Sequence, residues 1–242
     1  VPLNQIIMTV KRRLEGYANI DTLVSTAIKM KNPTKHLQRL VDAKNTALWI
    51  LVQSSPATQA WFAKHSNTFL VFGSVDQQIQ APWLDTKWQA TGLHLTGLSK
   101  RYDHRNVLVI ERHTQTAGSK LLKESYTNHF AQSNIQHQGI FPEHGVIPLL
   151  EMKISRSKSP RESPTLIVFY EQSDLITGIT WLMAKGWKIP EDISVICLDA
   201  DESITNIYPS IAHYRRPIRK LATALTNMIT MQLDEPKPTQ SL

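Results

Sequence analysis

The chain has 242 residues and a formal net charge of +7, with 41% hydrophobic and 19% charged residues. This composition excludes disordered, fibrous and coiled-coil proteins, and the length predicts two lobes of about 100 to 150 residues each. Since Cys197 is the only cysteine and no apolar stretch approaches the ~18 to 20 residues that span a bilayer, we expect no disulfide framework, no membrane segment and a reducing, cytoplasmic setting.

Along the chain, short β-branched apolar runs alternate with segments that carry apolar residues at helical spacing. The runs predict buried strands over 46–52, 68–72, 106–110, 165–169 and 193–198. Helices are predicted over 6–17, 35–43, 56–64, 88–99, 118–130, 175–185 and 217–231. This alternation is typical of βαβ units, so we predict an α/β fold with parallel sheets.

The beginning of the chain and one internal segment do not fit this alternation. Residues 1–5 read as a loop that enters a helix, so we expect that a preceding strand is missing. Residues 155–164 are rich in Pro and Ser, and the densest basic run, 153–161, overlaps them without aromatic residues. This composition predicts a solvated loop rather than a nucleic-acid contact.

Residues 184–199, which read AKGWKIPEDISVICLD, form the most specific motif. Gly186 is suited to close a helix in the left-handed conformation, Pro190 prevents its continuation, and the following run enters the sheet. The segment resembles one that is typical of LacI/GalR transcription regulators, in which a strand ends in Asp. Residues 103–110 (DHRNVLVI) and 207–217 (IYPSIAHYRRP) resemble two further segments of that family, and the order of elements agrees from about residue 46 to residue 234.

This resemblance implies a periplasmic-binding-protein-like fold of type I, with two Rossmann-like lobes. The first lobe would comprise residues 1–104 together with a crossover helix over about 214–232, and the second would comprise residues 105–213. The resemblance also implies a homodimer that binds a small-molecule effector, a sugar or polyol, in the cleft between the lobes and controls DNA binding allosterically. No helix-turn-helix pattern precedes Val1, so we expect the DNA-binding head to be absent from this chain.

Three positions depart from the family's common sugar-binding pattern. Leu122 stands where members often carry Arg, Gln172-Ser173 stands where they often carry Asn-Asp, and Cys197 replaces a usual Gly. Because the usual sugar clamp is missing, the resemblance does not identify the ligand as a common sugar.

Candidate ligand contacts follow the predicted strands, since open α/β sheets bind ligands at the carboxyl ends of their strands. Their carboxylates, amides and guanidinium suit the hydroxyls of a polyol. The candidates of the first lobe are Asn4, Ser74 and Asp85, and those of the second lobe are Arg112, Glu171, Gln172 and Asp199. Asp199 is the strongest, because strand-end position and resemblance agree, although a helix cap or turn is an alternative role. Each of Trp83, Trp88 and Tyr170 either stacks on a sugar or belongs to a core or interface.

Catalytic and metal motifs do not support an enzyme. Ser155 and Lys158 match Ser-x-x-Lys only formally, because they lie in the Pro/Ser segment and have no partner motif. Asp199 and Asp201 resemble a magnesium-binding pair, but no phosphate loop accompanies them. The nine histidines show no convincing ligand spacing, so we expect neither a metal nor a cofactor. The alternatives are a solute-binding protein of a sugar transporter and a doubly wound enzyme.

Overall fold

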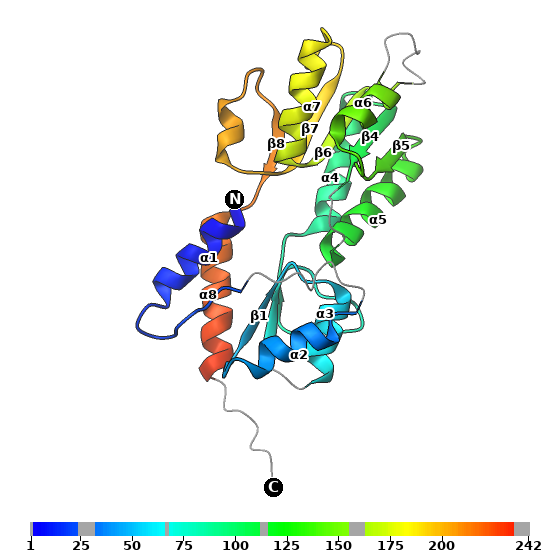
Figure 1. Ribbon diagram of the computed structural model, residues 1–242. Helices are drawn as coiled ribbons and strands as arrows, with labels where there is room; N and C mark the ends of the chain where they lie inside the picture. Colours follow the sequence, from blue (N-terminus) through cyan, green and yellow to red (C-terminus); the bar gives the residue numbers. More distant parts are fainter. Residues whose placement is uncertain (1, 24–31, 66–67, 112–115, 155–162, 235–242) are drawn as a thin grey trace. The chain divides into compact units, whose positions relative to one another are not determined.

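The computed structural model describes residues 2–23, 32–65, 68–111, 116–154 and 163–234 (Figure 1). The chain divides into two compact units. Unit 1 contains Val1–Thr86, Thr116–Gly118 and Pro217–Leu242, and unit 2 contains Lys87–Gln115 and Ser119–Arg216.

Unit 1 is built on a parallel three-stranded sheet of order β1-β2-β3. Its elements are α1 (Pro2–Arg13), α2 (Thr34–Asp42), β1 (Trp49–Val52), α3 (Pro56–Lys64), β2 (Phe69–Phe72), β3 (Trp83–Leu84) and α8 (Ile218–Asp234). Helices α1 and α8 lie side by side and share a core with Leu70 and Phe72 (Figure 1). Helices α2 and α3 share a second core with Phe69 and Val71, because alternate residues of a strand point to opposite faces.

Unit 2 is built on a parallel five-stranded sheet of order β5-β4-β6-β7-β8. Its strands are β4 (Asn106–Ile110), β5 (Gln136–Ile140), β6 (Leu166–Glu171), β7 (Ser194–Ala200) and β8 (Ala212–Arg215). Its helices are α4 (Trp88–Arg101), α5 (Ala117–Gln132), α6 (Val146–Lys153), α7 (Gln172–Ala184) and the short 3-10 helix η2 (Glu202–Asn206). Residues of α4 and α5 pack on Val107 and Val109, whereas residues of α6 and α7 pack on Leu108 and Ile110.

The α/β class with parallel sheets is confirmed, and each predicted strand forms within its expected range or within two residues of it. The apolar runs did not predict strands β3, β5 and β8, and helices α6 and η2 were not predicted either. Strand β5 has the sequence QHQGI and lies at the edge of its sheet with partly exposed residues, so it carries no apolar run. Helix α6 spans eight residues, which is too short for a clear helical period.

The expected lobe boundary after residue 104 differs from the boundary between the units, which lies between Thr86 and Lys87. Helix α4 accounts for the difference, because its residues Trp88 and Leu95 are buried in a core of unit 2 with Val107 and Val109.

Two local features of the motif at 184–199 are present in the structure. Gly186 adopts a φ of +77°, and Trp187 N–H donates to the Leu182 carbonyl, so α7 ends on a left-handed glycine as predicted. Cys197 is a buried free thiol in β7, and burial raises its pKa to about 12.

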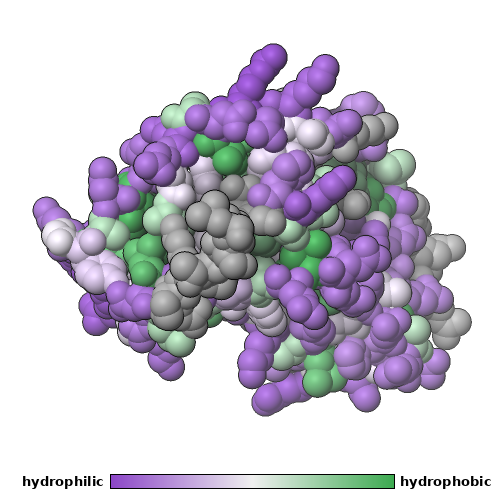
Figure 2. Space-filling view, turned by 90° about the horizontal axis from the view of Figure 1, so that it is seen from below, coloured by the Kyte–Doolittle hydropathy of each residue, from purple (hydrophilic) through white to green (hydrophobic). Residues whose placement is uncertain are grey.

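The surface seen in Figure 2 is mostly hydrophilic, and the hydrophobic residues visible on that face lie in separate small groups. Within the described ranges, every helix lacks the length or the hydropathy needed to cross a bilayer.

Candidate functional site

Polar residues gather at the carboxyl edge of the five-stranded sheet. Glu171 ends β6 and is in register with Asp199 on the adjacent strand β7, while Gln172 begins α7 directly after β6. Because the strands are parallel, these three candidates from the sequence lie at one edge of unit 2, where open α/β sheets place their ligands.

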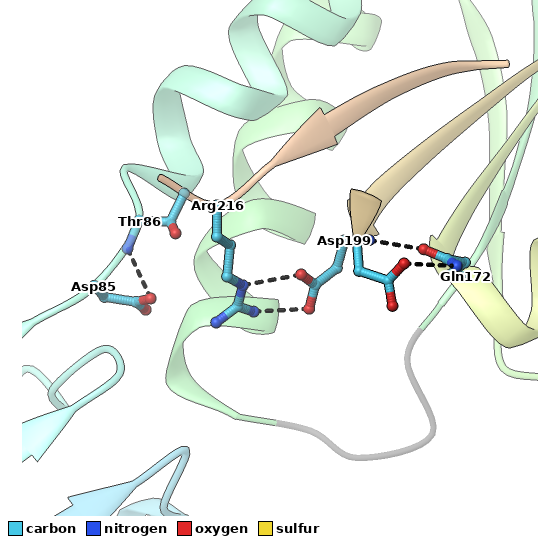
Figure 3. Close-up of polar contacts among 6 residues, drawn as sticks. Asp85, Thr86, Gln172, Asp199 and Arg216 are labelled. Atoms are coloured by element: carbon cyan, nitrogen blue, oxygen red, sulfur yellow. Dashed lines mark hydrogen bonds and ion pairs between the residues drawn. The ribbon is translucent and has the colours of Figure 1, made fainter. Parts of the chain in front are cut away.

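Asp199 forms a bidentate salt bridge with Arg216 (Figure 3). The guanidinium donates from Nε to Oδ1 over 2.9 Å and from Nη2 to Oδ2 over 2.8 Å. The side chains of Arg216 and Asp199 are only 11% and 17% exposed. A shielded pair of this geometry is stronger than a surface ion pair, and it holds the carboxylate in one orientation.

Arg216 was not among the residues predicted from the sequence. It directly follows β8, which pairs with β7, and this neighbourhood brings it to Asp199. The carboxylate predicted at the end of this strand was a signal that could have pointed to Arg216, because a carboxylate that is shielded from water is usually paired with a cation.

Trp88 and Tyr170 support the ion pair from the core. The Arg216 guanidinium carbon lies 5.7 Å from the Trp88 ring centroid, and the Trp88 and Tyr170 rings are 5.7 Å apart. Both aromatic residues are buried, with exposed fractions of 4% and 3%, so their placement agrees with the core alternative. Trp88 presents its ring to the cation, which is a cation–π arrangement.

Gln172 ties the start of α7 to the turn after β7. Its Nε2 donates to Asp201 Oδ1 over 3.2 Å, and its Oε1 accepts from Asp201 N–H over 2.7 Å (Figure 3). Its Nε2 also donates to Ser203 Oγ over 2.8 Å. Both ends of the amide therefore hold this turn, which makes Gln172 a positioning residue.

Asp201 is the N-cap of η2, and its carboxylate accepts hydrogen bonds from the Ser203 hydroxyl and the Ser203 N–H. These bonds, the hydroxyl first, lower the pKa of Asp201, and Gln172 adds to the effect. Within the described ranges, no group of three His, Cys, Asp or Glu residues is arranged to hold a metal ion.

The carboxyl edge of the sheet in unit 1 carries a second polar group. Ser74 donates from Oγ to Asp85 Oδ2 over 2.5 Å. Asp85 Oδ1 accepts from Thr86 N–H over 2.7 Å (Figure 3). Gln59, which is fully buried and was not predicted, donates to the Ser74 carbonyl and to Ser54 Oγ over 3.1 Å each. The structure thus brings Ser74 and Asp85 together and fixes the loops that carry them.

The remaining positions from the sequence do not join these groups. Asn4 lies exposed in the first turn of α1, and none of the hydrogen bonds among described residues joins it to Ser74 or Asp85. Arg112 lies outside the described residues. Leu122 is 1% exposed in a core of unit 2, so it contributes packing where many relatives are expected to carry Arg.

Comparison with known proteins identifies a family. Residues 99–242, more than half of the chain, match the model of the periplasmic binding protein-like domain. This is a family of binding domains rather than of enzymes, in agreement with the rejection of an enzyme from the sequence. The chain is also 26% identical over 139 residues to the probable HTH-type transcriptional repressor ExuR of Bacillus subtilis, which covers 55% of this chain and 41% of that protein. The chain therefore spans less than half of the length of this curated relative.

Solved structures of low sequence identity share the fold. A regulatory protein of the LacI family from Chloroflexus aggregans matches with a TM-score of 0.80 at 16% identity, over 99% of this chain and 87% of that chain. A LacI family transcriptional regulator from Lactobacillus casei with bound sucrose matches with a TM-score of 0.75 at 12% identity, over 100% of this chain and 90% of that chain.

Proposed function

Because the chain belongs to the family of periplasmic binding protein-like domains, we propose that it is the effector-binding domain of a bacterial transcription regulator of the LacI type. The similarity to a probable repressor and to LacI-family structures supports this proposal. In it, a small molecule binds at the carboxyl edge of the five-stranded sheet, and no reaction is catalysed. In this proposal, a DNA-binding head of the regulator contacts the operator, and two copies of the chain form a dimer.

The Asp199–Arg216 pair is the observation that supports a binding role at this edge. Each carboxylate oxygen of Asp199 accepts one bond from Arg216, and a carboxylate oxygen has room for a second. A ligand with neighbouring hydroxyl groups would use these positions, so the proposed ligand is a sugar or polyol. The solved relative from Lactobacillus casei holds sucrose, which is consistent with this class.

Regulation requires that the effector bind two states of the domain with different affinities, since a ligand with equal affinity for both shifts nothing. Ligand contacts stay predictions for four further residues, namely Ser74, Asp85, Glu171 and Gln172. That both units contribute to one ligand also stays a prediction. The alternative function, a solute-binding protein of a transporter, would use the same periplasmic binding protein-like domain. Binding of the full-length protein to an operator fragment distinguishes the two functions, because only a regulator binds DNA.

A thermal-shift screen against neutral sugars, polyols and phosphorylated sugars tests the proposal. A ligand at a hundred times its dissociation constant stabilises the folded protein by about 2.7 kcal/mol, which raises the melting temperature of a chain of this size by several degrees. The proposal fails if none of the three classes raises the melting temperature.

Calorimetric titration of the strongest ligand then tests the site. Asp199→Asn should weaken binding by about tenfold to a hundredfold, because one charged acceptor is lost. Arg216→Gln and the double variant complete a mutant cycle. If Asp199 and Arg216 each contact the ligand independently, the two losses add. If one of them acts only by orienting the other, the double variant loses no more than the single variant of the residue that contacts the ligand.

Asp103→Asn is the matched control, since Asp103 pairs with Arg105 over 2.7 Å on the surface of the same unit, with side chains 78% and 71% exposed. It should bind the ligand like the unaltered protein. Wild-type affinity in Asp199→Asn would refute the site assignment.

A further inference from the structure

A second carboxylate, Glu111, lies at the same edge of unit 2. It directly follows β4, and its N–H donates to the carbonyl of Ile140, the last residue of β5, over 2.9 Å. Two side chains of α5 hold its Oε1: Tyr126 donates from its hydroxyl over 2.9 Å, and Lys123 Nζ lies 2.8 Å away. Glu111 is therefore oriented by a neutral donor and a cation.

Gly139 of β5 makes room for this arrangement. A Cβ at this position would lie 2.3 Å from Glu111 Oε1 and 2.6 Å from the Tyr126 hydroxyl oxygen, which is too close for any real contact. Gly139 does not have a positive φ, so its backbone conformation does not require glycine. The absence of a side chain allows Glu111 and Tyr126 to meet over β5.

The other carboxylate oxygen, Oε2, faces a different environment. Among the described residues, no hydrogen bond or ion pair reaches it. It is also not one of the fully buried polar atoms that lack a partner, so it belongs to the 16% of the Glu111 side chain that is exposed. The Lys123 side chain is 52% exposed, and its ammonium carries three N–H donors. An oriented acceptor and an accessible donor therefore lie side by side.

We propose that Glu111 and Lys123 bind a vicinal diol of the same ligand: one hydroxyl donates to Glu111 Oε2, and its neighbour accepts from Lys123 Nζ. Two adjacent hydroxyls match an adjacent acceptor and donor, whereas a single hydroxyl uses only one of them. Because the charges of Glu111 and Lys123 cancel, the pair favours a neutral diol over a charged group. This inference rests on the proposed function.

The position of the pair agrees with one ligand that also reaches Asp199. Only β6 lies between β4 and β7, and neighbouring strands are ~4.8 Å apart, so the two strand ends are separated by about 10 Å along the edge. An extended polyol or a small oligosaccharide covers such a separation.

Calorimetric titration with D-glucose, D-galactose, D-xylose, sucrose and D-mannitol, and with the monodeoxy analogues of each sugar that binds, tests the inference. Glu111→Gln and Lys123→Met should each weaken binding by about tenfold, the loss of one charged hydrogen bond. In the unaltered protein, removal of either hydroxyl of one vicinal pair should weaken binding by a similar factor. In Glu111→Gln, removal of the hydroxyl that donates to Glu111 should have little further effect.

The matched controls are Glu124→Gln and Lys120→Met on the same helix, whose side chains are 50% and 79% exposed and lie 4.0 Å apart. Both should retain full affinity. If Glu111→Gln does not fold, Lys123→Met still tests the inference, because the Lys123 side chain is 52% exposed and its replacement should leave the fold intact. Affinity within twofold of wild type in Lys123→Met, or an equal loss for every analogue in Glu111→Gln, overturns the inference while the proposed function stands. Failure of the unaltered protein to bind any of these five compounds also overturns the inference, whereas the proposed function falls only if the thermal-shift screen of all three ligand classes fails as well.

Discussion

Single side chains at the carboxyl edge of unit 2 are oriented by bonds to their neighbours. Arg216 orients Asp199, and Tyr126 and Lys123 orient Glu111. Gln172 holds the turn that follows β7. Groups that are already ordered lose little conformational entropy when they bind a ligand, so this arrangement favours affinity.

Asp201 leads to a prediction about pH. Its hydrogen bonds with Ser203 lower its pKa in the folded protein below the value in the unfolded chain. The bonds therefore stabilise the fold fully above about pH 4, the unfolded pKa of Asp, and this stabilisation is lost as the pH falls further. Ser203→Ala removes the hydroxyl donor, so the stability difference between the two proteins should shrink as the solution is acidified.

Urea unfolding at a series of pH values between neutral and acid measures this difference. Thr205→Ala is a control in the same short helix, because the Thr205 hydroxyl bonds only to a backbone carbonyl, that of Glu202, among the described residues. A difference for Ser203→Ala that stays constant with pH would contradict the role of the hydroxyl in holding the Asp201 charge.

At the scale of elements, helices α4 and α5 approach closely through Gly92. A Cβ at this position would lie 2.5 Å from Ser125 Oγ and 2.9 Å from the backbone nitrogen of Tyr126. The backbone of α5 therefore has to move if Gly92 gains a side chain. Since Tyr126 and Lys123 are both on α5, this contact also fixes the helix that holds Glu111.

Gly92→Ala should accordingly destabilise the protein by about 1 to 3 kcal/mol, the usual effect of overpacking. Gly97 on the same helix provides the control, because nothing lies within 4 Å of its Cβ position. Gly97→Ala should stabilise by about 0.5 to 1 kcal/mol through helix propensity alone. Urea unfolding measures whether each variant has a higher or a lower free energy of unfolding than the unaltered protein. An equal increase in both variants would mean that the α4–α5 contact is not tight.

At the scale of the whole molecule, the two units are not consecutive in sequence. The chain leaves unit 1 after Thr86 and returns to it at Pro217, so α8 completes a unit that α1 began. Helices α1 and α8 share a core, and Ile6, Val10, Leu225 and Ile229 are buried in it. Unit 1 therefore depends on both ends of the described chain.

The proposed regulator role predicts a homodimer, because a two-fold protein matches a symmetric operator. Sedimentation of the chain at tens of micromolar should show a mass near twice 27.5 kDa. The measurement should be repeated with the ligand found by the screen, so that a ligand-dependent association is also detected. A single monomer species under both conditions would contradict the prediction.

The sequence predicted most elements of the fold, because the burial of an element determines where its apolar residues stand. A helix with one buried face has apolar residues at helical spacing. The strands that became β4, β6 and β7 are continuous apolar runs, since both faces of these strands are covered by helices. Edge strand β5 left no such record. The sequence also placed Asp199, Glu171 and Gln172 at strand ends, and the parallel sheet brings them to one edge.

By itself, therefore, the sequence determined the α/β class, the order of the elements and the strand ends at which polar residues stand. Only the tertiary structure decided which of those residues bond to one another. Asp199 and Arg216 are separated by the turn after β7 and by β8, and Glu111 meets Tyr126 and Lys123 only because α5 packs over Gly139. The pattern of apolar residues in an element can be recognised within that segment of the sequence. The hydrogen-bond partner of a side chain depends instead on which elements, distant in sequence, pack together, and no pattern within one segment specifies that.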